Sequence, residues 1–128
     1  MLIRGIRGAT TVPSNSRDEI LAAARELLDE IERRNEIDRA NVASIVFTTT
    51  PDLDAEFPAV AARDAGWTDV ALECLHEMNV PGSLPRCLRI LMHVNSDRAQ
   101  AEIIHVYLRD AAVLRPDLVT DQATEATT

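Results

Sequence analysis

Five segments of the chain have the apolar pattern or the composition of β-strands. They span residues 2–12, 42–50, 69–74, 86–94 and 105–114. In residues 87–94 the alternation is regular, so one face carries Leu88, Ile90, Met92 and Val94 and the other carries Cys87, Arg89, Leu91 and His93. Residues 42–50 are rich in β-branched side chains and end at the turn signal Pro51-Asp52. In the last segment the same alternation predicts that one face carries Tyr107, Arg109, Ala111 and Val113, followed by Arg115.

Helical spacing is found mainly between residues 16 and 35. Ser16 followed by Glu19 fits a capping box, and large apolar residues then recur at helical spacing, namely Ile20, Leu27, Leu28 and Ile31. Pro58 suits a first helical position, and the alanine-rich stretch after it stops at Gly66. We also expect a short helical turn near residues 99–102. Strands and helices therefore mix in one α+β or α/β unit.

The length of 128 residues predicts one domain, which we place at residues 1–116. Apolar residues make up 46% and charged residues 27%, which is typical of a globular protein. The polar, threonine-rich residues 117–128 offer nothing to a core, and we expect a mobile tail. The N-terminus lacks the apolar run of a signal peptide, and no stretch is long enough for a membrane helix. We expect a cytoplasmic protein.

The net charge of -8 argues against a nucleic acid or an anionic membrane as partner, because both require an electropositive surface. All 13 basic residues are arginines, and a local anion site remains compatible with the overall charge. Arginines lie inside three predicted strands, with Arg7, Arg89 and Arg109 as examples. A half-buried arginine needs an anion, either an acidic residue at the sheet edge or the carboxylate of a ligand. Glu77, just past a strand end, favours a functional site, but both interpretations stay open.

The cysteines and histidines suggest two further kinds of site. Cys74, His76 and Glu77 have the right side chains for zinc, but no second cluster completes a four-ligand set. Cys74 could act as a nucleophile, although no motif places a histidine beside it, and a packed core thiol is the simpler interpretation. Cys74 and Cys87 have no CxxC spacing and are expected to be free thiols. Glycine-rich nucleotide motifs and the GxSxG motif of serine hydrolases are absent from the sequence. Residue patterns alone thus predict an anion-binding α/β domain.

Four stretches, in order and at matching spacing, resemble the monofunctional, AroH-type chorismate mutases. They are RGIRGATTV, TPDLDAEFPAVAAR, CLHEMNVPGSLPRCLRILMHV and HVYLRDAAVLRPDL, and the likeness covers residues 2–118. This resemblance implies a five-stranded mixed sheet with helices on one side, and a homotrimer whose protomers form a barrel-like assembly. It implies active sites between neighbouring protomers, the conversion of chorismate to prephenate by a Claisen rearrangement, and no cofactor or metal.

The resemblance also assigns roles to individual residues. Arg89 matches the cation beside the ether oxygen of chorismate, where negative charge grows in the transition state. Arg7 and Tyr107 match groups that bind the substrate's carboxylates. Glu77, together with the backbone and thiol of Cys74, matches groups that meet the ring hydroxyl.

Other positions match residues that line the cleft. From the adjacent protomer the resemblance implies Phe57, Ala59 and Arg63, the last adding positive charge; it also includes Leu72 and, near the chain's end, Leu114 and Arg115. Two residues depart from the family pattern. Val60 stands where relatives often have a lysine, and Glu73 where they commonly have threonine. A higher KM would follow if the missing lysine steers the dianion.

Two other functions remain as alternatives. A trimeric imine or enamine deaminase of the Rid type resembles the expected fold and also binds carboxylates with an interface arginine. It would need a group that activates water, and the stretches RGIRGATT and around Glu77 are not expected there. The third hypothesis is a non-catalytic module that senses an aromatic-pathway acid through the same arginines. Turnover of chorismate distinguishes the mutase from both.

Overall fold

The structure is a computed structural model, and it describes residues 1–114 of the chain. The predicted mobile tail at residues 117–128 and the candidate site residue Arg115 lie outside the described residues. Within them, no helix has both the length and the apolar character needed to cross a membrane.

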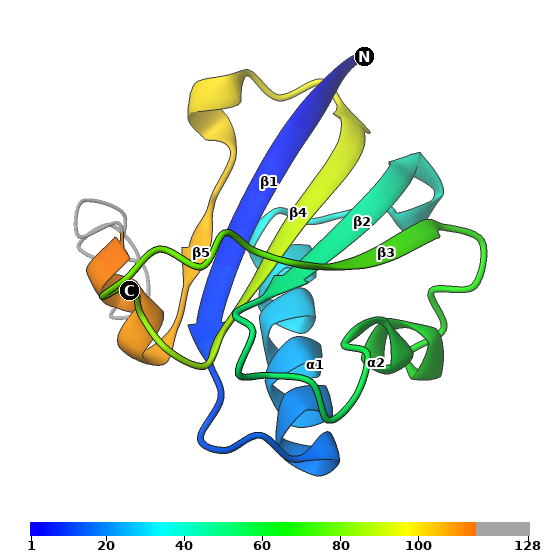
Figure 1. Cartoon of the computed structure of the whole chain (residues 1–128). Helices are drawn as coiled ribbons and strands as arrows, with labels where there is room; N and C mark the ends of the chain where they lie inside the picture. Colours follow the sequence, from blue (N-terminus) through cyan, green and yellow to red (C-terminus); the bar gives the residue numbers. More distant parts are fainter. Residues whose placement is uncertain (115–128) are drawn as a thin grey trace.

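The described residues form one mixed sheet, as the sequence predicted (Figure 1). Its strands are β1 (Leu2–Thr11), β2 (Val42–Thr49), β3 (Ala71–His76), β4 (Cys87–Ser96) and β5 (Val106–Tyr107). Their order across the sheet is β3-β2-β4-β1-β5. The central β4 is antiparallel to β1 and β2, whereas the two outer strands pair in parallel with their neighbours. The expectation of a five-stranded mixed sheet is therefore confirmed.

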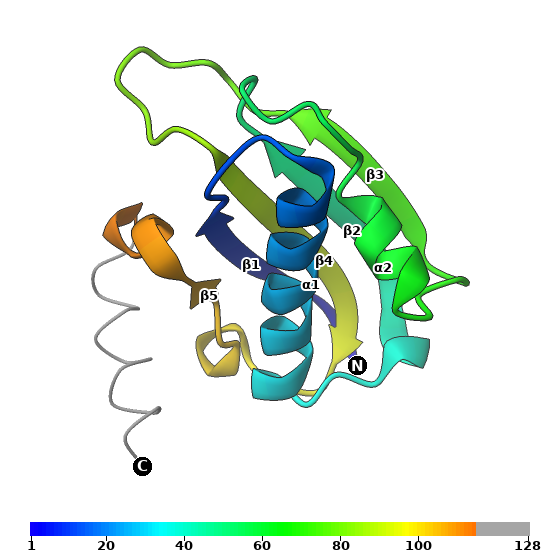
Figure 2. The same ribbon diagram turned by 90° about the horizontal axis from the view of Figure 1, so that it is seen from below.

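The helices occupy one face of this sheet, where α1 (Arg17–Arg34) and α2 (Ala59–Asp64) lie side by side (Figure 2). Helix α1 begins as predicted, because the Ser16 hydroxyl accepts a hydrogen bond from the Glu19 N–H at 3.2 Å. Gly66 follows α2 with a φ of 93°, a conformation that glycine adopts without strain. Three short 3₁₀ helices connect the rest: η1 (Arg39–Asn41), η2 (Gln100–Glu102) and η3 (Arg109–Leu114).

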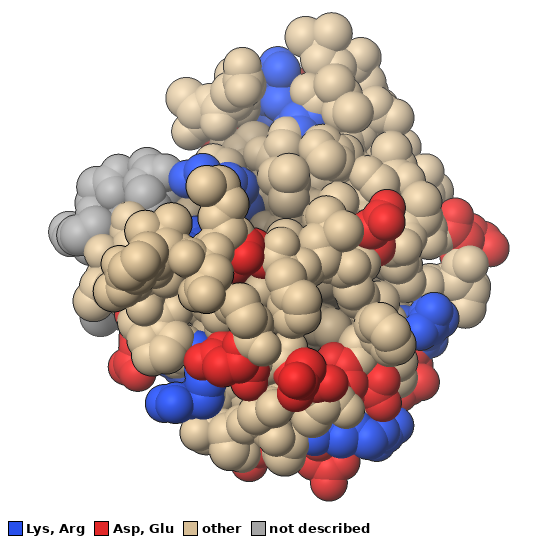
Figure 3. Space-filling model, viewed as in Figure 1, with Lys and Arg blue, Asp and Glu red and all other residues tan. Residues whose placement is uncertain are grey.

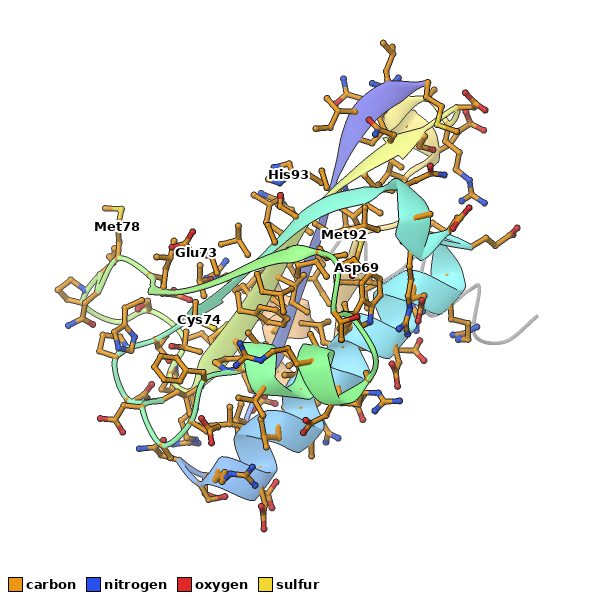
Figure 4. All side chains as sticks on the ribbon, turned by 90° about the vertical axis from the view of Figure 1, so that its right-hand side faces the viewer. Asp69, Glu73, Cys74, Met78, Met92 and His93 are labelled. Atoms are coloured by element: carbon orange, nitrogen blue, oxygen red, sulfur yellow. The ribbon has the colours of Figure 1, made fainter. Side chains whose placement is uncertain are left out.

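The core lies between α1 and the sheet. The buried face of the strands is formed by Ile6, Ile45, Phe47, Leu88, Ile90, Met92 and Val94, and α1 contributes Ile20, Leu27, Leu28 and Ile31. The alternation predicted for β4 is thus observed. Figure 4 shows its result directly, since Met92 points toward the helices and His93 points to the opposite face. Neither α1 nor α2 covers that opposite face, which we call the open face.

The segment 105–114 differs from the prediction of a long fifth strand. Only Val106–Tyr107 is a strand, and η3 follows it. Strand pairing stops at Tyr107 and Ala9, two residues before β1 ends at Thr11, and the Leu108 N–H makes a last bond to the Ala9 carbonyl at 2.9 Å. Arg109 then takes a φ of 52°, which turns the chain out of the sheet. The predicted face shared by Tyr107, Arg109, Ala111 and Val113 does not exist, and Arg109 instead pairs with Glu26 of α1 at 3.1 Å.

Gly8 allows α1 to pack closely against β1, and we expect Gly8→Ala to destabilise the fold. A Cβ at position 8 would lie 2.8 Å from Ile31 Cδ1, 3.0 Å from Leu27 Cδ1 and 3.2 Å from the Val106 carbonyl oxygen. Overpacking of this kind costs about 1–3 kcal/mol of unfolding free energy, and urea unfolding would measure it. Gly5→Ala is the matched control, because its Cβ would meet only Leu91 Cδ1 at 3.8 Å. Equal unfolding midpoints for the two variants would contradict the prediction.

Candidate active site

The candidate catalytic residues gather around one row of paired positions on the open face. Residues that are paired across neighbouring strands have side chains on the same face of a sheet. From β5 to β3 the row contains Tyr107, Ala9, Arg89, Thr48 and Leu75. Ala9 has the smallest side chain of these and stands between Tyr107 and Arg89. Because strands are spaced about 4.8 Å apart, a tyrosine and an arginine on either side of an alanine can approach each other above it.

The arginine in this row is held by an acidic residue from the end of β3. Arg89 Nε donates to Glu77 Oε1 at 3.0 Å, and Nη2 donates to Oε2 at 3.4 Å. Glu77 is itself fixed by its backbone, since its N–H donates to the Thr49 carbonyl at 2.9 Å. The side chain of Arg89 is 39% exposed and that of Glu77 is 15% exposed. One edge of the guanidinium is therefore fixed by Glu77, and part of the group still reaches the surface.

The protonation state of Arg89 follows from two opposing effects. Burial lowers the pKa of Arg89, but the hydrogen bond and the negative charge of Glu77 outweigh it and leave the pKa raised. Arg89 is therefore a permanent cation at physiological pH. The acidic partner that was one interpretation of this arginine is present, and this acid, Glu77, is itself a candidate site residue. Binding of a ligand carboxylate stays a prediction.

A small apolar cluster lies beside Arg89 and fixes Tyr107. Tyr107 is 6% exposed and packs with Ala9, Cys87 and Ala111, while Leu84 and Leu114 cover the cluster from outside. The candidate residue Leu114 therefore lies near Tyr107. Leu84 comes from the segment between β3 and β4, which runs across to η3 in Figure 1. Burial raises the pKa of the Cys87 thiol to about 11, so this thiol stays neutral beside the arginine.

The start of β4 is fixed by a network that the sequence analysis did not identify. Thr50 accepts from the Cys87 N–H with its hydroxyl and donates its own N–H to the Cys87 carbonyl, both at 3.0 Å. The next link is Asp52, whose carboxylate accepts from the Thr50 hydroxyl and, at 2.9 Å, from the Arg86 N–H. Arg89 is two residues beyond Cys87, so this network sets its position along the strand. The only sequence signal was the Thr-Pro-Asp turn, which we interpreted as a strand end.

Arg7 lies on the same open face, one step along β1. It is paired with Leu91, two residues beyond Arg89 on β4, and it is exposed. Its backbone N–H donates to His105 Nδ1 at 3.0 Å. The structure thus places four predicted site residues on one side of the sheet: Arg7, Glu77, Arg89 and Tyr107. We call these four residues with Leu114 the arginine cluster.

The other predicted site residues surround α2, and we call them the α2 cluster. They are Phe57, Ala59, Arg63, Leu72 and Cys74. Phe57 and Cys74 line a groove of about 310 Å³ together with Pro58. Burial raises the pKa of the Cys74 thiol, against the opposing effects of the Ala59 amide and the positive charge of Arg63, so all three lie close together. Arg63 and Leu72 also line a second groove beside Trp67.

The two clusters do not meet within one chain. Cys74 is paired in register with Phe47 and Phe47 with Ile90, so Cys74 belongs to the helix side of the sheet, whereas Arg89 is on the open face. Figure 4 shows Cys74 and its neighbour Glu73 on opposite sides of β3. The expected proximity of the Cys74 thiol to Glu77 and Arg89 is therefore not present in a single protomer. No cleft lined by both clusters is present within the described residues of one chain.

The surface has apolar residues suited to such a contact. Phe57 is 67% exposed, and Leu75, Met78 and Val80 are also exposed. Figure 3 shows a mainly uncharged surface over the middle of the sheet, with many charged side chains toward the lower edge and further basic ones at the top and upper left. Clustered apolar exposure of this kind marks an interaction surface.

The alternative chemistry around Cys74 finds no support in the geometry. Among residues 1–114, no three His, Cys, Asp or Glu side chains are grouped so that they could hold a metal ion. Glu77 is bonded to Arg89, and His76 Nδ1 lies 3.2 Å from the Thr49 hydroxyl. The raised pKa keeps the Cys74 thiol protonated near neutral pH, which is unfavourable for a nucleophile.

Comparisons with known proteins agree on one family. Residues 3–118 match the family model described as chorismate mutase type I. The chain is 45% identical to chorismate mutase AroH of Bacillus subtilis (strain 168) over 126 residues, covering 98% of this chain and 99% of the relative. It is 46% identical to chorismate mutase AroH of Thermus thermophilus over 122 residues, covering 94% and 100%. A solved chorismate mutase from Clostridium thermocellum is 52% identical and has a TM-score of 0.84, covering 85% of this chain and 97% of that one.

Proposed function

The chain belongs to the chorismate mutase type I family, as its sequence predicted, and on this premise we propose that it converts chorismate to prephenate. This isomerase reaction belongs to the shikimate branch that leads to phenylalanine and tyrosine. The observation that carries the proposal is the Arg89 guanidinium, fixed at one edge by Glu77 on the open face. The cytoplasmic location stays a prediction.

The proposed mechanism is a rearrangement of the substrate's own electrons. The ether C–O bond of chorismate breaks while a new C–C bond forms, so atoms and charge balance without a proton donor or a cofactor. Negative charge grows on the ether oxygen in the transition state, and Arg89 would stabilise it there. Because Glu77 holds the guanidinium in advance, little reorganisation accompanies the reaction. Arg7 and Tyr107 would bind the substrate's carboxylates.

We further propose that the active protein is a homotrimer with each site shared between neighbouring protomers. The support is the separation of the two clusters on opposite sides of the sheet. The arginine cluster of one protomer would supply Arg89, and the α2 cluster of its neighbour would supply Phe57 and Arg63. The Cys74 thiol would then reach the substrate from the neighbour's side of the cleft. Exposed Phe57 is the residue that most needs this burial.

The direct test is to mix the purified protein with chorismate and to follow the loss of its ultraviolet absorbance. Formation of prephenate supports the proposal. Binding of chorismate without turnover would instead indicate the sensor, and release of ammonia from an imine or enamine, with chorismate left intact, would indicate the deaminase. Val60 and Glu73, which depart from the family pattern, are expected to raise KM rather than to abolish turnover.

We expect kcat to change by less than about twofold between about pH 6 and pH 9. The raised pKa of Arg89 keeps it cationic throughout this range, since a base is protonated below its pKa. Cys87, with a pKa of about 11, stays neutral because a thiol loses its proton only near or above its pKa. A pH series of initial rates at saturating chorismate measures this. A bell-shaped kcat profile in that range would contradict a mechanism without proton transfer.

A further inference from the structure

We propose that His105 is a positioning residue that holds the backbone of Arg7 in place for substrate binding. This inference rests on the proposed function, in which Arg7 binds a carboxylate. His105 has no assigned role in the site described above, and its ring accepts a hydrogen bond from the backbone N–H of Arg7.

The edge of β1 shows why such a residue is needed at Arg7. Strand β5 pairs with β1 only at Gly8 and Ala9, so the backbone of Arg7 lies just before the ladder begins. The Arg7 N–H points to this edge, where His105 Nδ1 accepts it at 3.0 Å. An amide that points to this edge cannot also bond to β4 on the other side. The imidazole therefore takes the place of a strand carbonyl.

The backbone just before His105 is anchored from the end of α1. Asn35, which follows the last residue of α1 and is 4% exposed, donates to the Ile104 carbonyl at 2.8 Å. The Asn35 Oδ1 accepts from the Ile104 N–H, also at 2.8 Å. Both backbone groups of the residue before His105 are thus fixed. The histidine connects the end of α1 to the exact strand position that carries Arg7.

His105 also fixes the spacing between two expected substrate ligands. Tyr107 lies two residues beyond it on β5, in register with Ala9, and Arg7 lies two residues before Ala9 on β1. One ring therefore links the segments that present Arg7 and Tyr107. Loss of the bond would allow the edge of β1 to move, so binding of the substrate would weaken, whereas Arg89 on β4 would keep its position. The expected signature is a rise in KM with kcat unchanged.

Three substitutions test which ring atom matters. His105→Asn keeps an acceptor at the place of Nδ1, His105→Gln places its amide near Nε2, and His105→Ala removes both. For chorismate we expect KM of the Ala and Gln variants to rise about fivefold and kcat to stay within about twofold. The Asn variant is expected to stay within about twofold of the unmodified protein in both constants. Steady-state kinetics of the three variants and the unmodified protein measure kcat and KM for this comparison.

Two kinetic outcomes would overturn the inference: an unchanged KM in His105→Ala, or recovery by Gln in place of Asn. A folding defect of the Ala variant would leave the Asn and Gln pair for the comparison. An unmodified protein that leaves chorismate intact would refute the proposed function instead. In that case the hydrogen exchange of the Arg7 amide, measured by NMR, tests the role of His105. We expect this amide to exchange about tenfold faster in the Gln variant than in the Asn variant. Equal exchange would overturn the inference.

Discussion

Arg89→Ala is expected to lower kcat for chorismate by at least about a thousandfold, comparable to or beyond the loss of an oxyanion-hole donor. The guanidinium is held by Glu77 at 3.0 Å, and Arg89 is the third residue of a ten-residue strand, so its position is set before substrate arrives. Removing it takes away the cation that would stabilise the ether oxygen in the transition state. A water molecule in its place would have to reorient during the reaction. Initial rates at saturating chorismate measure the effect.

Arg25→Ala is a matched control for this experiment. Arg25 is an exposed arginine of α1 that pairs with Asp29 at 3.0 Å, so its loss removes the same side chain far from the site. Its kcat is expected within about twofold of the unmodified protein. Arg89→Lys adds a second comparison, because lysine keeps the charge but not the planar fork that binds Glu77. Turnover of the Ala variant within tenfold of the unmodified protein would refute the role of Arg89.

Mixed assemblies of two inactive variants are expected to recover about a third of the unmodified activity. Arg89→Ala damages the arginine cluster, and Arg63→Glu reverses the charge in the α2 cluster. If each site takes one cluster from each of two neighbouring protomers, a trimer that contains both variants has both intact clusters at about one site in three. Activity would then rise from about a thousandth to about a third. Co-expression of the two variants with different tags, followed by tandem purification and a rate assay, measures the recovery.

The controls for mixing are each variant carried through the same procedure alone. Arg63 is exposed on α2, so the charge reversal is compatible with folding. A double variant carrying both changes in one chain, mixed with unmodified protein, gives no complementation and shows the effect of dilution alone. Sedimentation of the unmodified protein supplies the independent readout. A stable, fully active monomer, or mixed assemblies no more active than their parents, would overturn the shared site.

Regular local patterns were enough to predict most of the fold. Helix α1 has a Ser16 cap and a four-residue apolar stripe, so periodicity and capping indicate the same helix. Strand β4 alternates in burial from Leu88 to Val94, because α1 and α2 cover only one of its faces. The resemblance then selected the five residues of the arginine cluster, and the structure brings them to one side of the sheet.

The remaining features depend on contacts between distant segments. Nothing in the alternating pattern of residues 105–114 shows that the chain turns out of the sheet at Arg109, where φ is 52°, and this turn follows a strand β5 of only two residues. Asp52 looked like a turn residue, whereas its bond to the Arg86 N–H joins positions 34 residues apart. The side of the sheet on which Cys74 lies follows from its pairing with Phe47 of β2. This pairing cannot be read from the residue pattern of β3 alone.

If each site is shared as proposed, the separation of the arginine cluster from the α2 cluster makes turnover a property of the assembly and not of the single chain. A lone chain would be correctly folded but catalytically inactive. Specific activity should therefore decline with dilution, at concentrations where the chain shows no sign of unfolding. A defective chain would then affect its neighbours, because it withholds half of a cleft that another chain needs.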